Sequence, residues 1–568
     1  MATYSQADRP IAIATPLGKD VLLLNGFRGQ ESISQLFHFD LEMLAESAGE
    51  IKFEKILGQT VTIEMRLVDG RQRFFNGLVS HFTQGRRTDE GFLLYHAEMV
   101  PKLWLLTRMV RSRVFQHLTI PEILKKVLAG FDVSWEISTA FKPRDYCVQY
   151  RESDFDFASR LMEEEGLFYY FKHTASGHQM VVTEQPAPSV PGESTLIYDE
   201  LKGGVREDVR IWSWEKTQQL RSGEVTLWDH CFELPNQNLE SKQKTVESVA
   251  VGKVTHKLKV GGNEKLELYE YPGGYAQRFD GVDEGGSPQP VQLQNIYADR
   301  VRTARIRMEQ ETVAGLTIRG AGNCGQFLPG HKFTLTRHFD GDGQYLLTRV
   351  EHDAQLGGNY RSDGDLPFRY ENRFTCLPIA LKYRPPRVTR KPFIAGVQTA
   401  RVVGPTGEEV FVDRYGRLKV QFYWDREGKK DAHSSCWVRV AQIWAGKGWG
   451  GFFWPRIGHE VVVAFEEGDP DQPLIVGSVY NGENLPPLKL PAGKNWGGIK
   501  SASVHGNARD NYNGVVFVDQ KGQEHLAIHS ERHLVINAEY DKSHSAGRHS
   551  GETVSNTRTT TVGTLPGL

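Results

Sequence analysis

Residues 436–477 read CWVRVAQIWAGKGWGGFFWPRIGHEVVVAFEEGDPDQPLIVG, a stretch in which glycines lie between tryptophans and a β-branched run follows. Its segment GKGWGG at 446–451 satisfies the G-x-G-x-x-G spacing of a dinucleotide-binding loop, which requires a helix to begin at the glycines and meet the pyrophosphate. Here Pro455 and a β-branched run follow the loop instead, and neither suits a helix. The pattern therefore predicts no cofactor and a structural hairpin, in which four glycines form a turn of a barrel: Gly446, Gly448, Gly450 and Gly451.

The rest of the chain is mostly typical of β-strands. Segments such as RLKVQFYW (417–424) alternate or are rich in Val, Phe, Tyr and Thr. Two segments predict helices. One follows the capping-box pair Thr119 and Glu122, and the other, SDFDFASRLMEEEG, begins at Ser153 and ends at Gly166. The sequence therefore predicts a mainly β protein with few helices.

Two proline-rich breaks divide the chain. The first, LPIALKYRPPRVTRKPF, spans 377–393, and the second begins at Asn481. Between them lie six strand candidates, a number that suits a small closed barrel of the oligonucleotide/oligosaccharide-binding (OB) type, although the sequence alone does not separate a barrel from a sandwich. These candidates centre on Val402, Val410, Val420, Val438, Val462 and Val476.

An eight-residue period marks the C-terminal segment. It brings Ala538, Ala546, Val554 and Val562 to equivalent positions. Residues eight apart point to the same face of a strand, but one small apolar side chain per eight residues cannot build a core within one chain. Several chains winding around a common axis could bury these side chains together. We therefore predict that the four residues form the core of an intertwined oligomer.

The charge balance and the cysteine content exclude several classes of protein. The 568 residues include 68 Lys and Arg and 70 Asp and Glu, a formal net charge of -2, so no long-range field attracts nucleic acid or an anionic membrane. Five scattered cysteines exclude zinc knuckles and dense disulfide scaffolds and suit a reducing cytosol. We find neither a signal peptide nor an apolar run of membrane-spanning length. We expect a soluble chain without nucleic-acid binding or stable membrane insertion.

Three histidines raise the question of a metal site. His525, His529 and His533 lie four residues apart, as ligands on one face of a helix would. Apolar residues around them recur with a period of two, however, which favours histidines on the polar face of strands. The sequence therefore predicts no metal.

Two further groups could be catalytic. Glu163, Glu164 and Glu165 could supply paired carboxylates, but they close a helix whose apolar stripe lies elsewhere, so we expect them on a solvated face. Three carboxylates at a helix C-terminus are electrostatically unfavourable, which leaves open a partner for one of them. Cys436 follows His433 closely, yet adjacency along a strand does not build a dyad, so we expect a buried thiol. No catalytic residue is predicted.

Several long stretches, taken together, resemble the VgrG family, whose members form the trimeric spike of bacterial type VI secretion. They are CVQYRESDFDFASRLMEEEGLFYYF (147–171), YENRFTCLP (370–378), GEEVFVDRYGRLKVQFYWDREGK (407–429), the stretch at 436–477 and LAIHSERHLVI (526–536). The resemblance implies a homotrimer with N-terminal β-barrel domains like a phage tail hub, then an OB-type barrel, then an intertwined triple-stranded β-helix.

The breaks and the resemblance together predict five segments. They are a phage-tail-hub-like domain (1–376), a Pro-rich linker (377–394), an OB-fold barrel (395–480), a neck (481–514) and the start of a β-helix needle (515–568).

The resemblance also implies a function. The chain would be a non-enzymatic spike that caps the Hcp tube hexamer and punctures target membranes to deliver effectors. Its further partners would be a PAAR-type tip protein and baseplate components, and it would leave the bacterial cytoplasm by type VI secretion. Related phage hubs carry a lysozyme domain before the needle, but the gap between Tyr480 and Val515 is too short for one. Two alternatives stay open: an envelope-degrading enzyme and the hub of a phage-like contractile particle.

Overall fold

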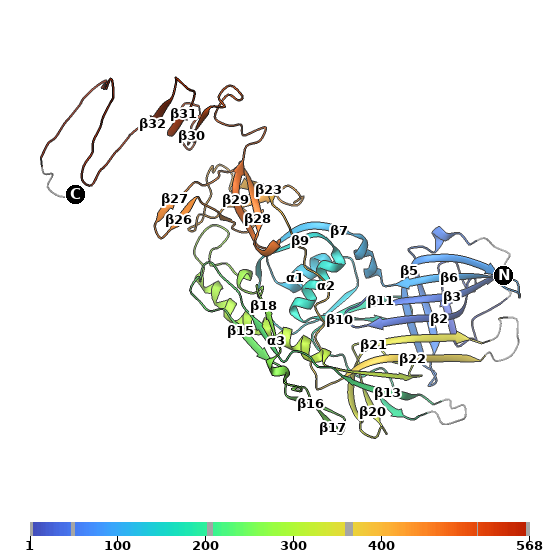
Figure 1. The fold of residues 1–568 in the computed structure, drawn as a ribbon. Coiled ribbons are helices and arrows are strands. Elements are labelled where there is room, and N and C mark those ends of the chain that lie inside the picture. Colours follow the sequence, from blue (N-terminus) through green and yellow to red (C-terminus); the bar gives the residue numbers. More distant parts are fainter. Residues whose placement is uncertain are drawn as a thin grey trace. The chain divides into compact units, whose positions relative to one another are not determined.

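The computed structural model describes residues 4–46, 51–200, 208–357, 360, 367–507 and 509–563. The chain divides into two compact units, Met1–Val479 and Tyr480–Leu568, and each is described by itself. The regular elements of both units are mainly strands, and the α-helices among the described residues belong to the first (Figure 1). The prediction of a mainly β protein is confirmed.

One large sheet forms the body of the first unit. It is 12-stranded, in the order β1-β4-β5-β6-β3-β2-β21-β20-β12-β13-β19-β22, and β22 also pairs with β21, so that the second half of the sheet closes on itself. In Figure 1 the blue strands β2 and β3 lie beside the yellow strands β21 and β22. The strands are β1 (Ile11–Ala14), β2 (Leu23–Ser32), β3 (His38–Glu46), β4 (Thr60–Arg66), β5 (Gln72–Arg87), β6 (Phe92–Val100), β12 (Thr195–Tyr198), β13 (Arg210–Gln218), β19 (Leu316–Gly322), β20 (Lys332–Thr336), β21 (Gly343–Leu356) and β22 (Phe368–Pro378).

Each half of this sheet encloses an aromatic core. In the first half, the rings of Phe27, Phe39 and Phe75 contact one another. In the second half, the ring centroids of Phe333 and Phe374 lie 5.9 Å apart. All five side chains are buried, because alternate residues of each strand face the interior. The expected N-terminal β-barrel domains are present.

Helices α1 (Ile120–Val127) and α2 (Asp154–Glu165) form where the sequence predicts them. The hydroxyl of Thr119 accepts from the Glu122 amide, and the Glu122 carboxylate accepts from the Thr119 amide at 2.8 Å, which completes the capping box. Gly166 ends α2 with a φ of 68°. Signals contained within a few residues therefore locate both helices.

The sequence did not predict a third helix, α3 (Asn295–Ala314), although the expectation of few helices is confirmed. The residue before it, Gln294, makes no capping hydrogen bond through its side chain. Its buried face includes the polar residues Thr303 and Gln310, so the apolar residues alone do not recur at helical spacing. Both of the usual sequence signals of a helix are therefore weak here.

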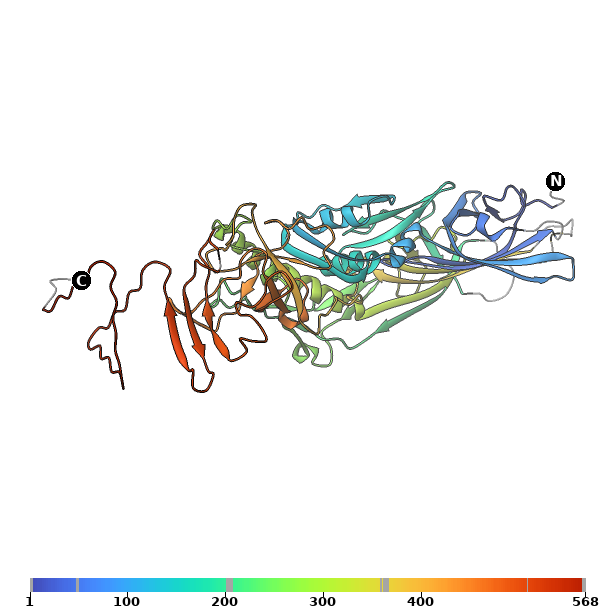
Figure 2. The same ribbon diagram turned by 90° about the horizontal axis from the view of Figure 1, so that it is seen from above.

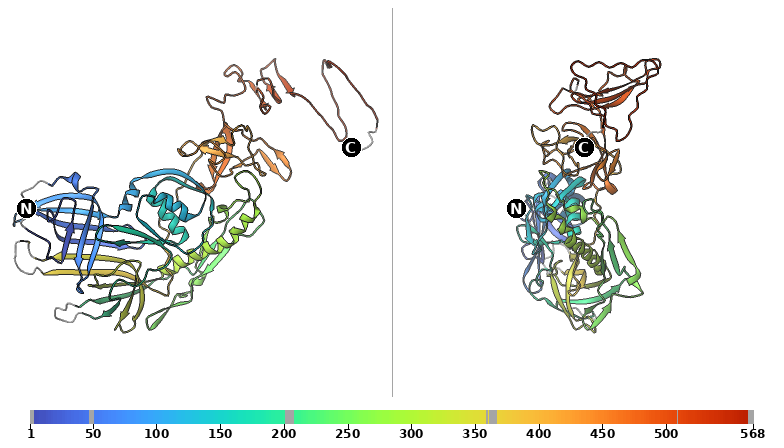
Figure 3. Two further views of the ribbon diagram at one scale, coloured as in Figure 1. Left: turned by 180° about the vertical axis from the view of Figure 1, so that it is seen from behind. Right: turned by 90° about the vertical axis from the view of Figure 1, so that its left-hand side faces the viewer.

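Short elements complete the first unit. Figure 3 shows α3 running along β14 and β15, which it contacts. No helix that the structure describes combines the length and the apolar composition needed to cross a membrane. The short strands are β7 (Val110–Leu118), β8 (Val133–Glu136), β9 (Arg144–Ser153), β10 (Phe168–His173), β11 (His178–Thr183), β14 (Glu224–Leu227), β15 (Ser241–Lys244), β16 (Ser248–Val251), β17 (Val254–Lys257) and β18 (Glu267–Glu270). The 3-10 helices are η1 (Phe53–Lys55), η2 (Lys102–Arg108), η3 (Asn263–Lys265), η4 (Ala276–Arg278), η5 (Pro290–Gln294) and η6 (Glu466–Gly468).

A small barrel lies at the C-terminal end of the first unit. Its strands pair in the order β24-β23-β28-β29-β25, and a bridge between Leu418 and Val438 joins the two edges. This closure is typical of an OB fold. The strands are β23 (Gln398–Val403), β24 (Lys419–Phe422), β25 (Arg439–Val440), β28 (Glu460–Phe465) and β29 (Pro473–Val479).

Of the six strands predicted for this barrel, the one centred on Val410 is not present, so that prediction is wrong. Val410 lies in a loop. Soon after it, the carboxylate of Asp413 accepts hydrogen bonds from the amides of Tyr415 and Arg417 at 2.9 and 2.8 Å. This side chain holds the backbone in a turn, and local bonds of that kind compete with strand pairing.

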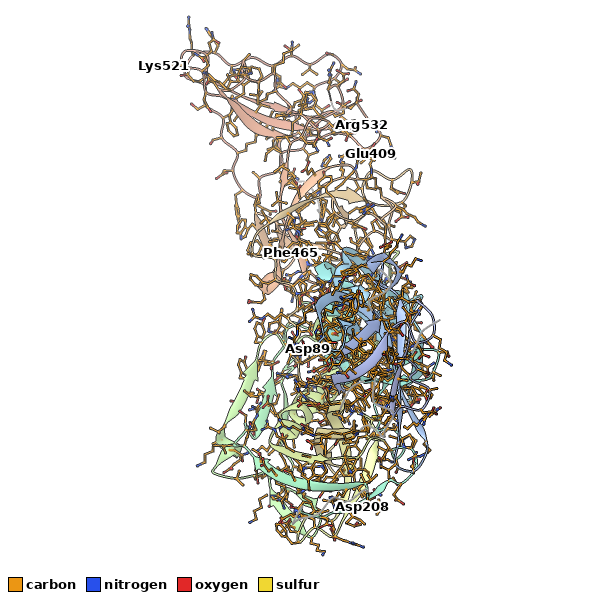
Figure 4. All side chains as sticks on the ribbon, turned by 90° about the vertical axis from the view of Figure 1, so that its right-hand side faces the viewer. Asp89, Asp208, Glu409, Phe465, Lys521 and Arg532 are labelled. Carbon is orange, nitrogen blue, oxygen red and sulfur yellow. The ribbon has the colours of Figure 1, made fainter. Side chains whose placement is uncertain are left out.

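The second unit begins with three antiparallel strands, β30 (Trp496–Lys500), β31 (Gly514–Val518) and β32 (His525–His529), which lie side by side in Figure 2. Among the described residues after β32, none is in a strand. In Figure 4 the side chains near Lys521 and Arg532 extend outward from a single layer, whereas those of the first unit crowd its interior. A single layer of this kind encloses no core of its own.

Candidate functional site

The predicted turn glycines lie in a tight hairpin. Strand β26 (Trp444–Gly446) pairs with β27 (Trp449–Gly451), which leaves Lys447 and Gly448 as the turn. Gly448 has a φ of 78° and Gly450 a φ of 144°, which glycine adopts readily and other residues do not. The chain then reaches β28 without a helix. The geometry of a dinucleotide loop, with a helix N-terminus at the glycines, is therefore missing.

The acidic triplet at the end of α2 is not on a solvated face, so that prediction is wrong. Glu163 and Glu165 are buried, and the side chain of Glu164 is 11% exposed. Glu163 accepts hydrogen bonds from the amides of Val388 and Thr389, both at 3.0 Å. The Pro-rich segment that contains these two residues therefore covers the end of the helix, and spacing along the sequence gave no sign of it.

Arginines from three separate elements meet the other two carboxylates. Arg144 of β9 forms ion pairs with Glu164 at 2.9 Å and with Glu165. Arg302 of α3 also pairs with Glu165, and Arg278 of η4 lies 3.9 Å from it. We call these five residues the arginine–glutamate joint. The partner that the sequence left open for the triplet is thus a group of cations.

The joint holds its carboxylates in the ionised form. Burial alone would raise the pKa of Glu165, but the charges of Arg144, Arg302 and Arg278 outweigh it and lower that pKa to about 2. Burial opposes the charge of Glu164 as well, yet its pKa is also lowered, chiefly by Arg144. A general acid needs the opposite shift, toward neutral pH. These carboxylates therefore link β9, η4 and α3 and are not poised for proton transfer.

A second buried ion cluster ties the small barrel to the rest of the first unit. The Arg417 guanidinium donates to both oxygens of Asp280, at 2.7 and 2.9 Å, and to Asp413 at 2.6 Å. All three residues are buried. Tyr146 and Val148 of β9 also belong to the hydrophobic core of the barrel. The small barrel therefore shares its hydrophobic core with the N-terminal part of the chain.

Cys436 is a buried thiol, as predicted. Burial raises the pKa of its thiol well above the usual value, so it is not an activated nucleophile. The neighbouring Ser435 hydroxyl donates to the Cys436 carbonyl and accepts from the Val420 amide. His433 instead lies 2.9 Å from Glu284. These contacts stabilise the barrel wall and do not form a catalytic dyad.

The histidine cluster lies on and beyond a strand. His525 and His529 are the ends of β32, so the predicted strand is confirmed there. His533 lies in an irregular segment, so the strand predicted for it is wrong. His529 stacks on Tyr512, with ring centroids 4.1 Å apart, and its Nδ1 lies 2.9 Å from the Tyr512 carbonyl oxygen. Within the described ranges, no three potential ligands converge as a metal site would require.

The three strands of the second unit leave apolar side chains uncovered. At least a third of each of five large side chains is exposed in the single chain: Ile499, Val515, Phe517, Leu526 and Ile528. Burying such side chains is worth about 1.5–3 kcal/mol each. This sheet therefore has a strong tendency to associate.

The predicted needle-core residues lie beyond these strands. Ala538, Ala546, Val554 and Val562 are all exposed in the single chain. Val562 is 93% exposed. Their role as a shared core stays a prediction, since only neighbouring chains could cover them.

Three families match the chain in order along its length. Residues 30–358 match the phage tail baseplate hub (GPD) family. Residues 407–480 match the type VI secretion system/phage-baseplate injector OB domain. Residues 497–565 match the bacteriophage T4 gp5 C-terminal trimerisation domain.

Similar proteins agree with these matches. The type VI secretion system spike protein VgrG1b of Pseudomonas aeruginosa is 35% identical over 557 residues, which cover 97% of this chain and 71% of that protein. An E. coli protein described as a type VI secretion component similar to the phage T4 tail proteins gp27 and gp5 has a TM-score of 0.54 at 20% identity, covering 82% of this chain and 99% of that one. A chain of a Francisella PdpA–VgrG complex has the same TM-score at 10% identity, and the match covers 92% of this chain and 80% of that one. At these identities the two structures establish the fold alone.

Proposed function

This chain belongs to the VgrG family of type VI secretion spike proteins, and from that premise we propose that it is a homotrimeric, non-enzymatic spike that caps the Hcp tube and punctures target membranes. The observation that carries the proposal is the uncovered apolar surface of β30–β32, in a segment that matches a trimerisation domain. Three copies would cover one another there. Ala538, Ala546, Val554 and Val562 would extend that shared core along the axis.

The proposed mechanism is mechanical. A contracting sheath drives the tube and spike forward, and the spike must carry compressive load without bending. Strands paired between chains leave no free edge, so no chain peels off alone. Within each chain, the arginine–glutamate joint and the Arg417 cluster connect elements that are distant in sequence. Such links hold the hub and the small barrel in one arrangement under load.

The proposed partners follow from the same role. The hub would bind the Hcp hexamer and baseplate components, and the needle would carry a PAAR-type tip. The Francisella structure is a complex of PdpA with VgrG, which supports the proposal that this spike binds other proteins, among them the effectors that it would deliver. It would reach the extracellular space or the target cell by type VI secretion itself.

The trimer is tested by light scattering after size-exclusion chromatography. We expect three chains per particle at micromolar concentration, and a stable monomer would rule out the intertwined needle. Val554→Asp should lower the melting temperature of the particle, because its charge is repeated around the axis without a partner. Ser555→Asp is the matched control, since adjacent strand residues face opposite sides. Equal effects of the two variants would mean that Val554 does not face a shared core.

The puncturing role is tested in cells. A strain that lacks this gene should release no Hcp into the medium, and the wild-type chain should restore release. Val554→Asp should restore less than Ser555→Asp does at equal protein level. Full release without any copy of the chain would contradict the spike function.

A further inference from the structure

Hydrogen bonds hold the tip of the β10–β11 hairpin against β4, β5 and η2. The tip, residues 174–177, joins two histidines, His173 and His178, which lie opposite each other on the paired strands. The side chains that meet the tip are Asn76 of β5 and Thr62 of β4, and both are buried. We call His178, Asn76 and Thr62 the histidine latch.

The bonds of the latch fix one proton on His178. The Thr62 hydroxyl donates to the Ala175 carbonyl at 3.1 Å, so it accepts from the amide nitrogen of the Asn76 side chain at 2.7 Å. The oxygen of that side chain then lies 2.9 Å from Nδ1 of His178. A carbonyl oxygen can only accept. His178 therefore carries a proton on Nδ1.

The second ring nitrogen of His178 carries no proton. The backbone amide of Lys102 in η2 donates to Nε2 at 3.0 Å, and an amide N–H group can only donate. A proton on Nε2 would place two donors opposite each other. The latch is thus closed only while His178 is neutral.

The surroundings of His178 oppose a positive charge on its ring. Burial has the largest effect on the pKa of His178, and His173 and Lys102 act in the same direction, against a smaller opposing effect of Asp132. Together these effects lower the pKa of His178 from 6.5 to about 3. A ring released into water has the ordinary pKa and takes up a proton at mildly acidic pH.

A second group of charges lies behind His173. The Nε2 atom of His173 is 3.1 Å from one carboxylate oxygen of Glu31. Arg73 and His352 contact the other oxygen of Glu31, at 2.9 and 3.1 Å. Glu31 is therefore already paired and does not serve as a counter-ion for His178.

Acid should open the latch. We propose that the histidine latch is a pH-sensitive switch, which holds the tip of β10–β11 on β5 and η2 while His178 is neutral and releases it when that ring is protonated. Release would uncover Phe37, which is buried and whose ring centroid lies 4.8 Å from that of His173 and 5.4 Å from that of His178. All of these contacts lie within one chain, so the switch does not depend on the proposed trimer.

The direction and size of the effect follow from the two pKa values of His178. Closing the latch lowers the pKa of a base, so the stability that the latch contributes is full above pH 6.5 and is lost as the pH falls toward 3. Opening takes up one proton, so the opening constant should approach a tenfold rise per pH unit below about pH 6. Between pH 7 and pH 5 the opening constant should rise roughly 20-fold.

Hydrogen exchange of the full chain at pH 7, 6 and 5 tests the switch. The Lys102 amide reports the opening, because its hydrogen bond ends at His178. After correction for intrinsic exchange, its opening constant should rise roughly 20-fold over this range. Amides of β19, a strand without histidine, should show no such rise. An opening constant that does not change with pH in the wild-type chain would overturn the proposal.

Matched variants assign the effect to His178. His178→Gln keeps a hydrogen-bond acceptor at this position but cannot take up a proton, so the rise at the Lys102 amide should vanish. His96→Gln is the control, since His96 is exposed on β6, and it should keep the full rise. An equal rise in both variants would overturn the proposal.

A second measurement needs no variant. Exchange of the C2 hydrogen of each histidine ring, followed by mass spectrometry, depends on the pKa and the exposure of that ring. At pH 7, His178 should exchange roughly 10-fold more slowly than His96, or slower still. Equal rates would mean that water reaches His178 and that its ring takes up protons while the tip is closed. That result would overturn the latch even if His178→Gln does not fold.

Discussion

Replacing Glu165 by Gln should destabilise the first unit strongly, although the change keeps the shape of the side chain. Glu165 is buried and pairs with Arg144 and Arg302. Gln cannot balance the two guanidinium charges. The variant therefore leaves buried cations without full compensation, which is a recognised cause of large destabilisation.

The magnitude follows from the pKa of the carboxyl group. That pKa falls from 4.5 to about 2 in the folded chain. Burial, the largest single effect, raises the pKa, but the charges of Arg144, Arg302 and Arg278 together lower it by more. A difference of roughly 2.5 pKa units corresponds to about 3 kcal/mol of folding free energy at pH 7. Because this pKa is lowered by folding, the contribution is present above the unfolded pKa and is lost as the pH falls through the folded one. At pH 3 less than half of this contribution should remain.

Hydrogen exchange of the α2 amides at pH 7 and urea unfolding at pH 7 and pH 3 measure this difference. The opening constant of α2 should rise roughly 100-fold in Glu165→Gln. Glu371→Gln is the control, since its ion pair with Arg369 is exposed and should contribute less than about 1 kcal/mol. A cost below about 1 kcal/mol for Glu165→Gln at pH 7, or an equal cost at both pH values, would refute the reasoning.

Three other outcomes are expected. Arg417→Met should cost about 3–5 kcal/mol by leaving two buried aspartates unpaired, and proteolysis should then cut around the small barrel, whereas an unchanged digest would contradict this. The thiols of Cys147, whose pKa burial raises to about 12, and of Cys436 should react with a thiol reagent at pH 8 only after unfolding; fast reaction of the native chain would contradict their burial. A chelator should leave the melting temperature unchanged, because His529 is already engaged by stacking and by its contact with a carbonyl oxygen; a drop of several degrees would indicate a bound metal.

The sequence located those elements whose signals are local. The capping box at Thr119 and the stop at Gly166 lie within a few residues of the helices that they bound. The hairpin was predictable in the same way, because Pro455 and the β-branched run follow the glycines directly. The strand periodicity likewise predicted most of the strands of the small barrel.

Features that depend on distant partners were missed. Glu165 and Arg302 are separated by 137 residues, and no pattern in a single sequence connects them. The helix that carries Arg302 has a partly polar buried face, so its periodicity is weak. The strand expected at Val410 was lost to the turn that Asp413 holds. The first miss reflects a partner that is distant in sequence, whereas the other two reflect local features that the pattern of apolar residues does not show.

Two kinds of contact thus contribute to the stability of this protein: ion pairs within one chain and apolar contacts between chains. In the first unit, charges are buried and paired within one chain, at the arginine–glutamate joint and at Arg417. Removal of one partner leaves a buried charge without compensation, so these pairs penalise any arrangement that separates them. In β30–β32 of the second unit, large apolar side chains are uncovered in the single chain. Their burial depends on other copies, so the stability gained there rises with protein concentration. We therefore expect the needle segment to reach its stable state on assembly.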